Sequence, residues 1–322
     1  WLLWAGHLSP VTYETDHLRE YYAIRSSAAL LDVSPLFKYH VSGPDAGRLL
    51  DLVVTRDLTR CRVGQAVYTP WCDPDGWIVD DGVVLRMADD RYRLTAADPN
   101  YAWLLDNAVG LDVEVEDVTD TVAALAVQGP TSREVLLELT DTVRDLRFFR
   151  GVDTTVAGVA VTITRTGYTG DLGYELWMDA SDAVPVWDAV FEAGLAHNLR
   201  PAGNAALDIA RIEAGLILNP VDYLPSRHTL FDVQRSTPLE LGLDWCVALD
   251  AGPFVGRDAL RREAAGGPRW RTVGLEAHWD ALEAVFSEFG MPPQLPTTSW
   301  GEPVPVYRRG TQVGRATSGT WS

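Results

Sequence analysis

Two neighbouring carboxylates, Asp80 and Asp81, lie in a segment that alternates as a β-strand does. Asp81 shares one face of this strand with the apolar residues Trp77, Val79, Val83 and Leu85. Because an apolar strand face packs inward, we predict that Asp81 is the desolvated acid, whereas Asp80 shares the opposite face with Arg86. A buried carboxylate can act as a functional acid, but it can equally cap a loop or pair with an arginine. Spacing alone leaves these alternatives open.

A second acid, Glu175, lies in the run GYELW at 173–177, on the same strand face as Trp177. An acid beside an aromatic ring can accept two parallel N–H groups, such as those of an aminopyrimidine edge, or it can form a cross-strand ion pair. Tyr68 can stack on a ligand ring or fill the core. Asp208 and Arg211 are three residues apart on an expected helix, and this spacing favours a simple salt bridge.

Several common catalytic motifs are absent from the sequence. It contains no Walker loop, no G-x-G-x-x-G, no H-E-x-x-H and no G-x-S-x-G. The six histidines are scattered and show no ligand spacing. We therefore expect neither a nucleotide-dependent enzyme nor a metal site.

Charge and cysteine content restrict the partners and the compartment. A formal net charge of −18 disfavours nucleic acid and anionic membrane surfaces as main partners. Three widely spaced cysteines without a CxxC motif predict a reducing, cytoplasmic environment, with neither a zinc site nor a disulfide framework. No apolar run is long enough to span a membrane.

The elements that would position the two acids read as an α+β fold. Residues 64–87 predict a strand, a tight turn at 73–76 (DPDG) and a second strand. Helices are expected over 16–31 and 203–218, a long polar loop over 220–240 and a strand over 245–249. Strands and helices interleave without a regular βαβ rhythm, and the chain ends in a β-rich region.

Eight segments, in the same order along nearly the whole chain, resemble the glycine-cleavage T-protein (aminomethyltransferase) family. They are SGPDA at 42–46, GQAVY at 64–68, GWIVDD at 76–81, VQGP at 127–130, RTGYTG with GYE at 165–175, RIEAG at 211–215, FVGRDAL at 254–260 and GRATSGT at 314–320. Each match alone is weak, but eight in order are a strong signal.

The resemblance implies a multi-domain arrangement around a central channel that holds tetrahydrofolate, ending in a β-barrel that is truncated here. It implies that Asp81 is the essential acid beside the folate nitrogens N5 and N10, and that Glu175 grips the pterin edge. The folate-binding residues that it implies are Tyr68, Val83, Tyr168, Glu175 and Arg211. We expect a discontinuous folate domain at 1–45 with 140–240, an α+β sheet domain at 46–139 and a β-rich domain at 241–322.

Several positions depart from the T-protein pattern. They are SPLF at 34–37, LTAAD at 94–98, Leu207 in place of an arginine, and a longer loop at 219–237. We expect these changes on the substrate side of the channel. The runs at 124–130 and 145–150 are more similar to the folate-dependent demethylases of the same superfamily.

These observations predict a cytoplasmic, tetrahydrofolate-dependent one-carbon transferase that moves a methyl or methylene group to folate N5. Asp81 would orient the folate and stabilise positive charge on its nitrogen, more than abstract a proton. The donor is either a small methyl compound or an aminomethyl group on a lipoyl carrier protein. The carrier is disfavoured because it is acidic and so is this chain. The alternative function is a folate-binding regulatory or assembly protein without transferase activity.

Overall fold

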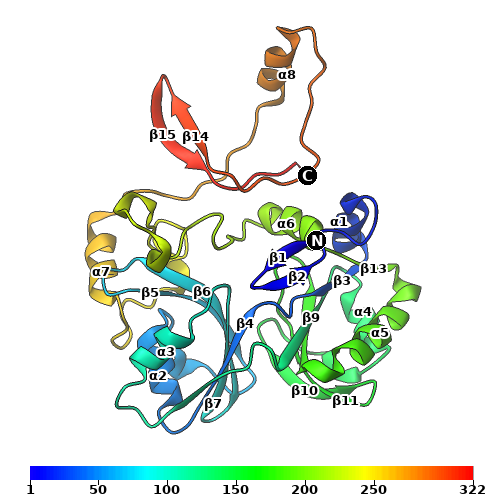
Figure 1. Ribbon diagram of the computed structural model, residues 1–322, viewed down its shortest axis with the longest axis vertical. Coiled ribbons are helices and arrows are strands. Elements are labelled where there is room, and N and C mark those ends of the chain that lie inside the picture. The colour runs from blue at the N-terminus through cyan, green and yellow to red at the C-terminus, as the bar shows by residue number, and fades with distance from the viewer. Residues whose placement is uncertain (322) are drawn as a thin grey trace.

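The computed structural model describes residues 1–321, in which two β-sheets lie side by side (Figure 1). The first sheet has six strands in the order β10 (Gly151–Val156), β11 (Val159–Thr164), β12 (Gly173–Asp179), β9 (Val122–Gln128), β3 (Ala28–Asp32) and β13 (Leu199–Pro201). Its strand pairs are antiparallel except β13 with β3. This mixture of strands and helices confirms the mixed α/β character predicted from the sequence.

The second sheet has five antiparallel strands. They are β5 (Ala66–Cys72), β6 (Ile78–Ala88), β7 (Arg91–Ala96), β4 (Phe37–Ser42) and β8 (Glu114–Asp117), in this order. The predicted hairpin is confirmed as β5 and β6, and its turn is closed by the Gly76 N–H donating to the Asp73 carbonyl at 2.9 Å. Gly76 has a φ of +84°, a conformation that favours glycine.

Helices pack around both sheets. They are α1 (His17–Ser26), α2 (Ala46–Val53), α3 (Tyr101–Asn107), α4 (Ser132–Leu137), α5 (Ala183–Gly194), α6 (Asn204–Glu213) and α7 (Arg257–Gly266). A further helix, α8 (Trp279–Ser287), lies apart from the sheets. The remaining strands form two separate hairpins. One joins β1 (Leu2–Trp4) to β2 (His7–Ser9), and the other joins β14 (Val304–Arg308) to β15 (Thr311–Ala316).

The six-stranded sheet is buried on both faces. Along β9, Leu125 and Val127 pack in the cluster that contains residues of α4 and α5, whereas Ala124 and Ala126 pack in the cluster that contains residues of α1 and α6. Alternate residues of a strand point to opposite faces, so a strand covered on both sides has to be apolar throughout. This explains the uninterrupted apolar run at 122–127.

The chain crosses from one sheet to the other between β3 and β4, and the single lysine of the sequence fixes this crossing. Lys38 is fully buried and donates to the carbonyl oxygens of Ser34 at 2.5 Å and Leu36 at 2.7 Å. Burial lowers the pKa of Lys38 to about 8. The crossing segment is therefore tied to β4 from inside the protein.

Three predicted element boundaries are wrong. The helix expected over 16–31 ends at Ser26, because residues 28–32 pair as a strand with β9. The helix expected over 203–218 ends at Glu213, and Gly215 follows with a φ of +71°. The strand expected over 245–249 is replaced by a short 3₁₀ turn at Asp244–Cys246. In each case tertiary contacts or a glycine override the local pattern.

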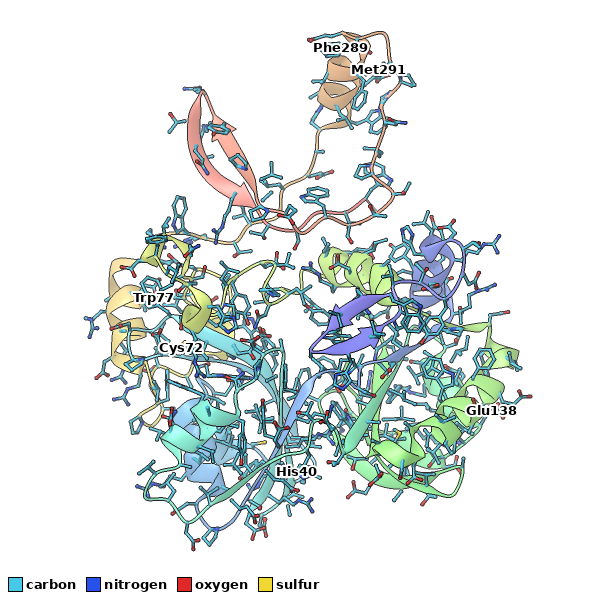
Figure 2. All side chains as sticks on the ribbon, in the orientation of Figure 1. His40, Cys72, Trp77, Glu138, Phe289 and Met291 are labelled. Atoms are coloured by element: carbon cyan, nitrogen blue, oxygen red, sulfur yellow. The ribbon has the colours of Figure 1, made fainter. Side chains whose placement is uncertain are left out.

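Within residues 267–321, α8 and the β14–β15 hairpin extend away from the two sheets, as Figure 1 shows. Ser299 and Ser318 return to hydrogen-bond Asp208 and Arg211 of α6. Figure 2 places Phe289 and Met291 at the end farthest from the sheets. Within the part of the chain described, β14 and β15 form a two-stranded sheet and no closed barrel is present. No helix up to residue 321 combines the length and apolar character needed to cross a bilayer.

Candidate active site

A cavity of about 1910 Å³ is lined by residues of both sheets and holds all six residues predicted for the site. Those six are Tyr68, Asp81, Val83, Tyr168, Glu175 and Arg211. Strands β5 and β6 supply the first three from the five-stranded sheet, and β12 supplies Glu175 from the six-stranded sheet. The structure therefore brings together residues that are up to 143 positions apart in the sequence.

Asp81 is held at the cavity wall by two tyrosine hydroxyls. Tyr68 donates to Oδ2 of Asp81 at 2.9 Å, and Tyr223 donates to Oδ1. Burial raises the pKa of Asp81, while both tyrosine hydrogen bonds oppose this shift. Of the three readings that spacing left open, a pair with an arginine is not formed within residues 1–321, where the side-chain hydrogen-bond partners of Asp81 are the phenols of Tyr68 and Tyr223.

The sequence analysis placed Asp80 and Asp81 on opposite faces of β6 and expected Asp81 to be the more buried acid. In the structure, Asp80 is the more buried of the two. Asp80 is fully buried, whereas Asp81 is partly exposed to the cavity. Val84 is also fully buried, and Ile78, beyond a bulge in β6, is buried in a separate cluster with Tyr223. Asp81 is desolvated as parity predicted, but parity did not show that the opposite face of β6, with Asp80, is covered as well. The face of Asp81 and Val83 contributes to the cavity.

Glu175 is held by a hydroxyl and lies near a buried cation. Thr166 donates to Oε2 of Glu175 at 2.6 Å. Burial raises the pKa of Glu175, and both Thr166 and the guanidinium of Arg93 lower it again. Arg93 is itself buried, with its guanidinium carbon 3.8 Å from the ring centroid of Trp177. The expected cross-strand ion pair is not formed, because no ion pair within residues 1–321 involves Glu175 at 4 Å or less.

Aromatic rings line the same cavity. Tyr68 stacks on Trp245, with ring centroids 5.9 Å apart, and the guanidinium of Arg56 lies 5.4 Å from the Trp245 centroid. The hydroxyl of Tyr168 donates to the carbonyl of Ile217. These rings offer flat surfaces on which a planar ligand can stack.

Arg211 forms the salt bridge that its spacing predicted. Its side chain is 1% exposed and contacts Asp208 at 2.6 Å and Asp222 at 2.6 Å. It also donates to the hydroxyl of Ser318 at 2.9 Å. Arg211 therefore joins α6 to the following loop and to the C-terminal region.

The predicted departures from the family pattern also gather at this cavity. Leu36, Phe37, Asp98, Leu207 and Asn219 all line it. Sequence reasoning missed Tyr223 and Trp245, although the longer loop at 219–237 pointed to the region of Tyr223. It also missed the N-terminal hairpin, whose residues 2–6 form part of the wall.

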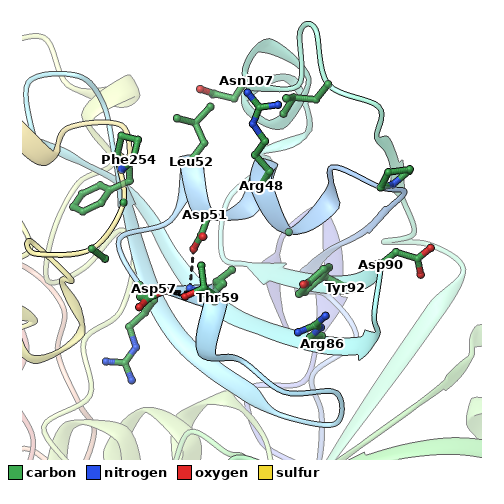
Figure 3. A pocket seen from close by; sticks show the side chains of 18 of the residues that line it. Arg48, Asp51, Leu52, Asp57, Thr59, Arg86, Asp90, Tyr92, Asn107 and Phe254 are labelled. Carbon is green, nitrogen blue, oxygen red and sulfur yellow. Dashed lines mark hydrogen bonds between the residues drawn. The ribbon is translucent and has the colours of Figure 1, made fainter.

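A second cavity, of about 800 Å³, lies beside α2 (Figure 3). Two of its charged side chains, those of Asp51 and Arg86, hydrogen-bond the backbone. Asp51 accepts from the Leu58 N–H at 2.7 Å, and Arg86 donates to the carbonyls of Cys61 and Asp89, each at 2.8 Å. None of the six predicted residues lies there, so we assign the candidate site to the larger cavity.

Up to residue 321, His, Cys, Asp and Glu side chains nowhere form a group of three that could bind a metal ion. His228 instead lies 3.2 Å from Asp98, a residue of the cavity wall.

Comparison with known proteins gives consistent matches. Residues 3–251 match the model of the GCVT N-terminal domain family. The chain is 36% identical over 278 residues to an aminomethyltransferase of Thermoanaerobacter sp. (strain X514), covering 84% of this chain and 73% of that protein. It is 39% identical over 273 residues to a trimethylamine-oxide aldolase of Ruegeria pomeroyi, covering 80% of this chain and 33% of that protein. The crystal structure of the glycine cleavage system aminomethyltransferase T from Bartonella henselae is similar, with a TM-score of 0.73, 28% identity and coverage of 83% of this chain and 71% of that one.

Proposed function

The chain belongs to the GCVT N-terminal domain family, and from this premise we propose that it transfers a one-carbon group to tetrahydrofolate in the larger cavity. Aminomethyltransferases dominate its most similar relatives, so the chain is a one-carbon transferase enzyme. The observation that carries the proposal is that Asp81 and Glu175, from two different sheets, line one cavity. Nothing favours the non-enzymatic alternative.

The residues of the cavity fit tetrahydrofolate. A volume of about 1910 Å³ exceeds the roughly 300–1,000 Å³ of ordinary small-molecule sites, which leaves room for a folate and a small donor together. Glu175 can accept the paired N–H groups of a pterin edge, and Tyr68, Trp245 and Tyr168 offer stacking surfaces. The folate, when bound, supplies the nitrogen nucleophile.

Each acid then has a distinct part in the reaction. Glu175 fixes the orientation of the pterin, so that the reacting nitrogen lies near the donor carbon. Asp81 stabilises positive charge that develops on this nitrogen, because a preoriented carboxylate in a desolvated site needs little reorganisation. Val83 provides apolar wall, and Arg211 keeps α6 and the adjoining loop in place around the site.

The identity of the one-carbon donor is part of the proposal. We propose a small N-, O- or S-methyl donor, as in the demethylase branch, because Leu36, Phe37 and Leu207 place apolar side chains among the residues that depart from the T-protein pattern and line the cavity. An acidic lipoyl carrier would meet a chain of net charge −18 and is disfavoured. Four further features stay predictions. They are the cytoplasmic location, the central channel, the truncated barrel and the domain boundaries after residues 45, 139 and 240.

Calorimetric titration with tetrahydrofolate tests the proposal. The native chain is expected to bind with micromolar affinity, Glu175→Gln to bind about 10- to 150-fold more weakly, and Asp81→Asn to retain binding without turnover in a methyl-donor screen. Glu192→Gln on the exposed face of α5 makes the same chemical change far from the cavity and should bind as the native chain does. Absence of heat with the native protein would refute the proposed function.

A further inference from the structure

The neighbouring carboxylates Asp80 and Asp81 differ in how many donors surround them. Asp80 accepts four N–H groups at 2.8–2.9 Å, two on each oxygen. Those on Oδ1 come from the backbone of Asp81 and the side chain of Asn219, and those on Oδ2 come from the backbone of Asp98 and the side chain of Asn100. A carboxylate has about four lone-pair sites, so those of Asp80 are filled.

The orientation of the Asn100 amide is fixed independently. Its Oδ1 accepts from Nε1 of Trp71 at 3.0 Å, and its Nδ2 must therefore face Asp80. A proton on Asp80 would displace one of the four donors and leave a buried N–H without a partner. Hydrogen bonding thus holds Asp80 in its ionised form.

Asp81 is left with open lone-pair sites. Within residues 1–321, its side chain accepts only from the hydroxyls of Tyr68 and Tyr223. Burial raises the pKa of this coupled pair, and the charge of one carboxylate favours a proton on the other. The proton that the pair binds therefore belongs on Asp81.

The 219–223 segment supplies one donor to each carboxylate. Asn219 donates to Asp80 at 2.9 Å, and Tyr223 donates to Asp81 while its oxygen lies 3.4 Å from Oδ1 of Asp80. This segment begins the loop in which the chain departs from the T-protein pattern. The division of roles between the two acids is therefore tied to a feature of this chain.

We propose that Asp80 is a permanently ionised positioning residue whose fixed charge makes Asp81 a proton acceptor near neutral pH, with Asn219 and Tyr223 holding the two carboxylates in these separate roles. The use of this acceptor rests on the proposed function. As a nitrogen nucleophile bonds to the donor carbon, the bond from that carbon to the donor heteroatom breaks and its electron pair leaves with the heteroatom. Asp81 accepts the proton that the alkylated nitrogen gives up, and the electron pair of that N–H bond returns to nitrogen.

Other titratable groups that face the pair do not supply an alternative acceptor at neutral pH. They are Tyr39 on β4, Tyr68 on β5, Asp98 after β7, Tyr168 after β11, Tyr223 after α6 and Cys246 in the 3₁₀ turn before Val247. Burial raises the pKa of each tyrosine and of Cys246, which keeps them protonated. Asp98 is committed to His228 at 3.2 Å.

Carboxyl-carbon NMR of the full chain labelled with [4-¹³C]aspartate tests the proposal in the absence of folate. The resonance of Asp81, identified by its loss in Asp81→Asn, should titrate above the usual aspartate range because burial raises its pKa. Asp80→Asn should lower the midpoint of this resonance by about one unit or more, because a like charge is lost. Tyr223→Phe should raise it, because a donor to the ionised form is lost.

The two variants shift the midpoint in opposite directions, which general loosening of the fold would not do. Asp188→Asn, on the exposed face of α5, is the matched control and should leave the midpoint unchanged. The proposal is overturned if the high-pH resonance belongs to Asp80, or if Tyr223→Phe leaves the midpoint unchanged or lowers it. If Asp80→Asn does not fold, the Tyr223→Phe arm still decides. Failure to bind tetrahydrofolate would refute the proposed function without altering these titrations.

Discussion

The two acids of the cavity are built in contrasting ways on its two sheets. Asp81, on the five-stranded sheet, has a second carboxylate beside it and only phenolic donors. Glu175, on the six-stranded sheet, has the Thr166 hydroxyl and the positive field of buried Arg93. A neighbouring anion raises proton affinity, and a neighbouring cation lowers it. One site thus favours taking up a proton, and the other favours keeping a charge with which to bind.

The contrast is tested most severely by Asp81→Asn. If Asp81 acts on the reacting nitrogen and Glu175 binds, this variant should lose two to four decades of transfer rate, on the order of 3–5 kcal/mol. Its dissociation constant for tetrahydrofolate should change by only a few-fold. Single-turnover rates and calorimetry on the same preparation measure both quantities. Equal losses of transfer rate and of tetrahydrofolate affinity in Asp81→Asn would contradict the assignment of a reacting role to Asp81 and a binding role to Glu175.

Glu175→Gln should show the reverse pattern. Loss of a charged acceptor for the pterin should weaken tetrahydrofolate binding by about 10- to 150-fold, or about 1.5–3 kcal/mol. In the native chain, binding needs the ionised carboxylate, and burial raises the pKa of Glu175. Affinity should therefore be present above this pKa and lost as the pH falls through it. Calorimetry between pH 4 and pH 8 should show this loss, and an affinity independent of pH would contradict the assignment.

Arg93→Met sharpens the comparison on the side of Glu175. Removing the cation should raise the pKa of Glu175 further, because Arg93 lowers it in the native chain. The pH at which tetrahydrofolate binding is lost should move upward by about one unit. The exposed Arg144→Met serves as a control for loss of an arginine. An unchanged pH profile in Arg93→Met would show that the cation does not act on Glu175.

Thermal stability carries the smallest expected effect. Burial raises the pKa of Asp81 above the ordinary aspartate value of 3.8. The folded state then binds this proton more tightly than the unfolded state, so stability falls as the pH rises from the ordinary aspartate pKa through the raised pKa of Asp81. Asp81→Asn should flatten this slope in melting temperature measured from pH 5 to pH 8. Lys38 begins to lose its proton in the folded state as the pH approaches its pKa of about 8, so the slope is compared between Asp81→Asn and the native chain, which share Lys38.

The hairpin and the site acids could be predicted from the sequence because their signals are local. Turn residues at 73–76 and the alternation after them locate β6, and Asp81 and Glu175 follow from it and from the family resemblance. Parity could not tell which face of β6 meets the core, because both faces are covered in the folded protein. The helix expected to 31 failed for a similar reason, since pairing of residues 28–32 with β9 outweighs their local preference.

The partners of the acids could not be predicted, because they come from distant parts of the chain. Tyr223 reaches Asp81 across 142 positions, and Asn219 reaches Asp80 across 139. No periodicity within a segment encodes such a contact. The sequence marked 219–237 as unusual, but only the packed structure shows what this segment contributes.

Lys38 gives the protein an unusual response to chemical labelling. It is the single lysine in the sequence, its amine is fully buried, and both of its hydrogen bonds go to the segment that joins the two sheets. An acylating reagent can reach this amine only when that junction opens. The rate of Lys38 modification, read as one mass increment on one peptide, would therefore time the separation of the two halves around the cavity.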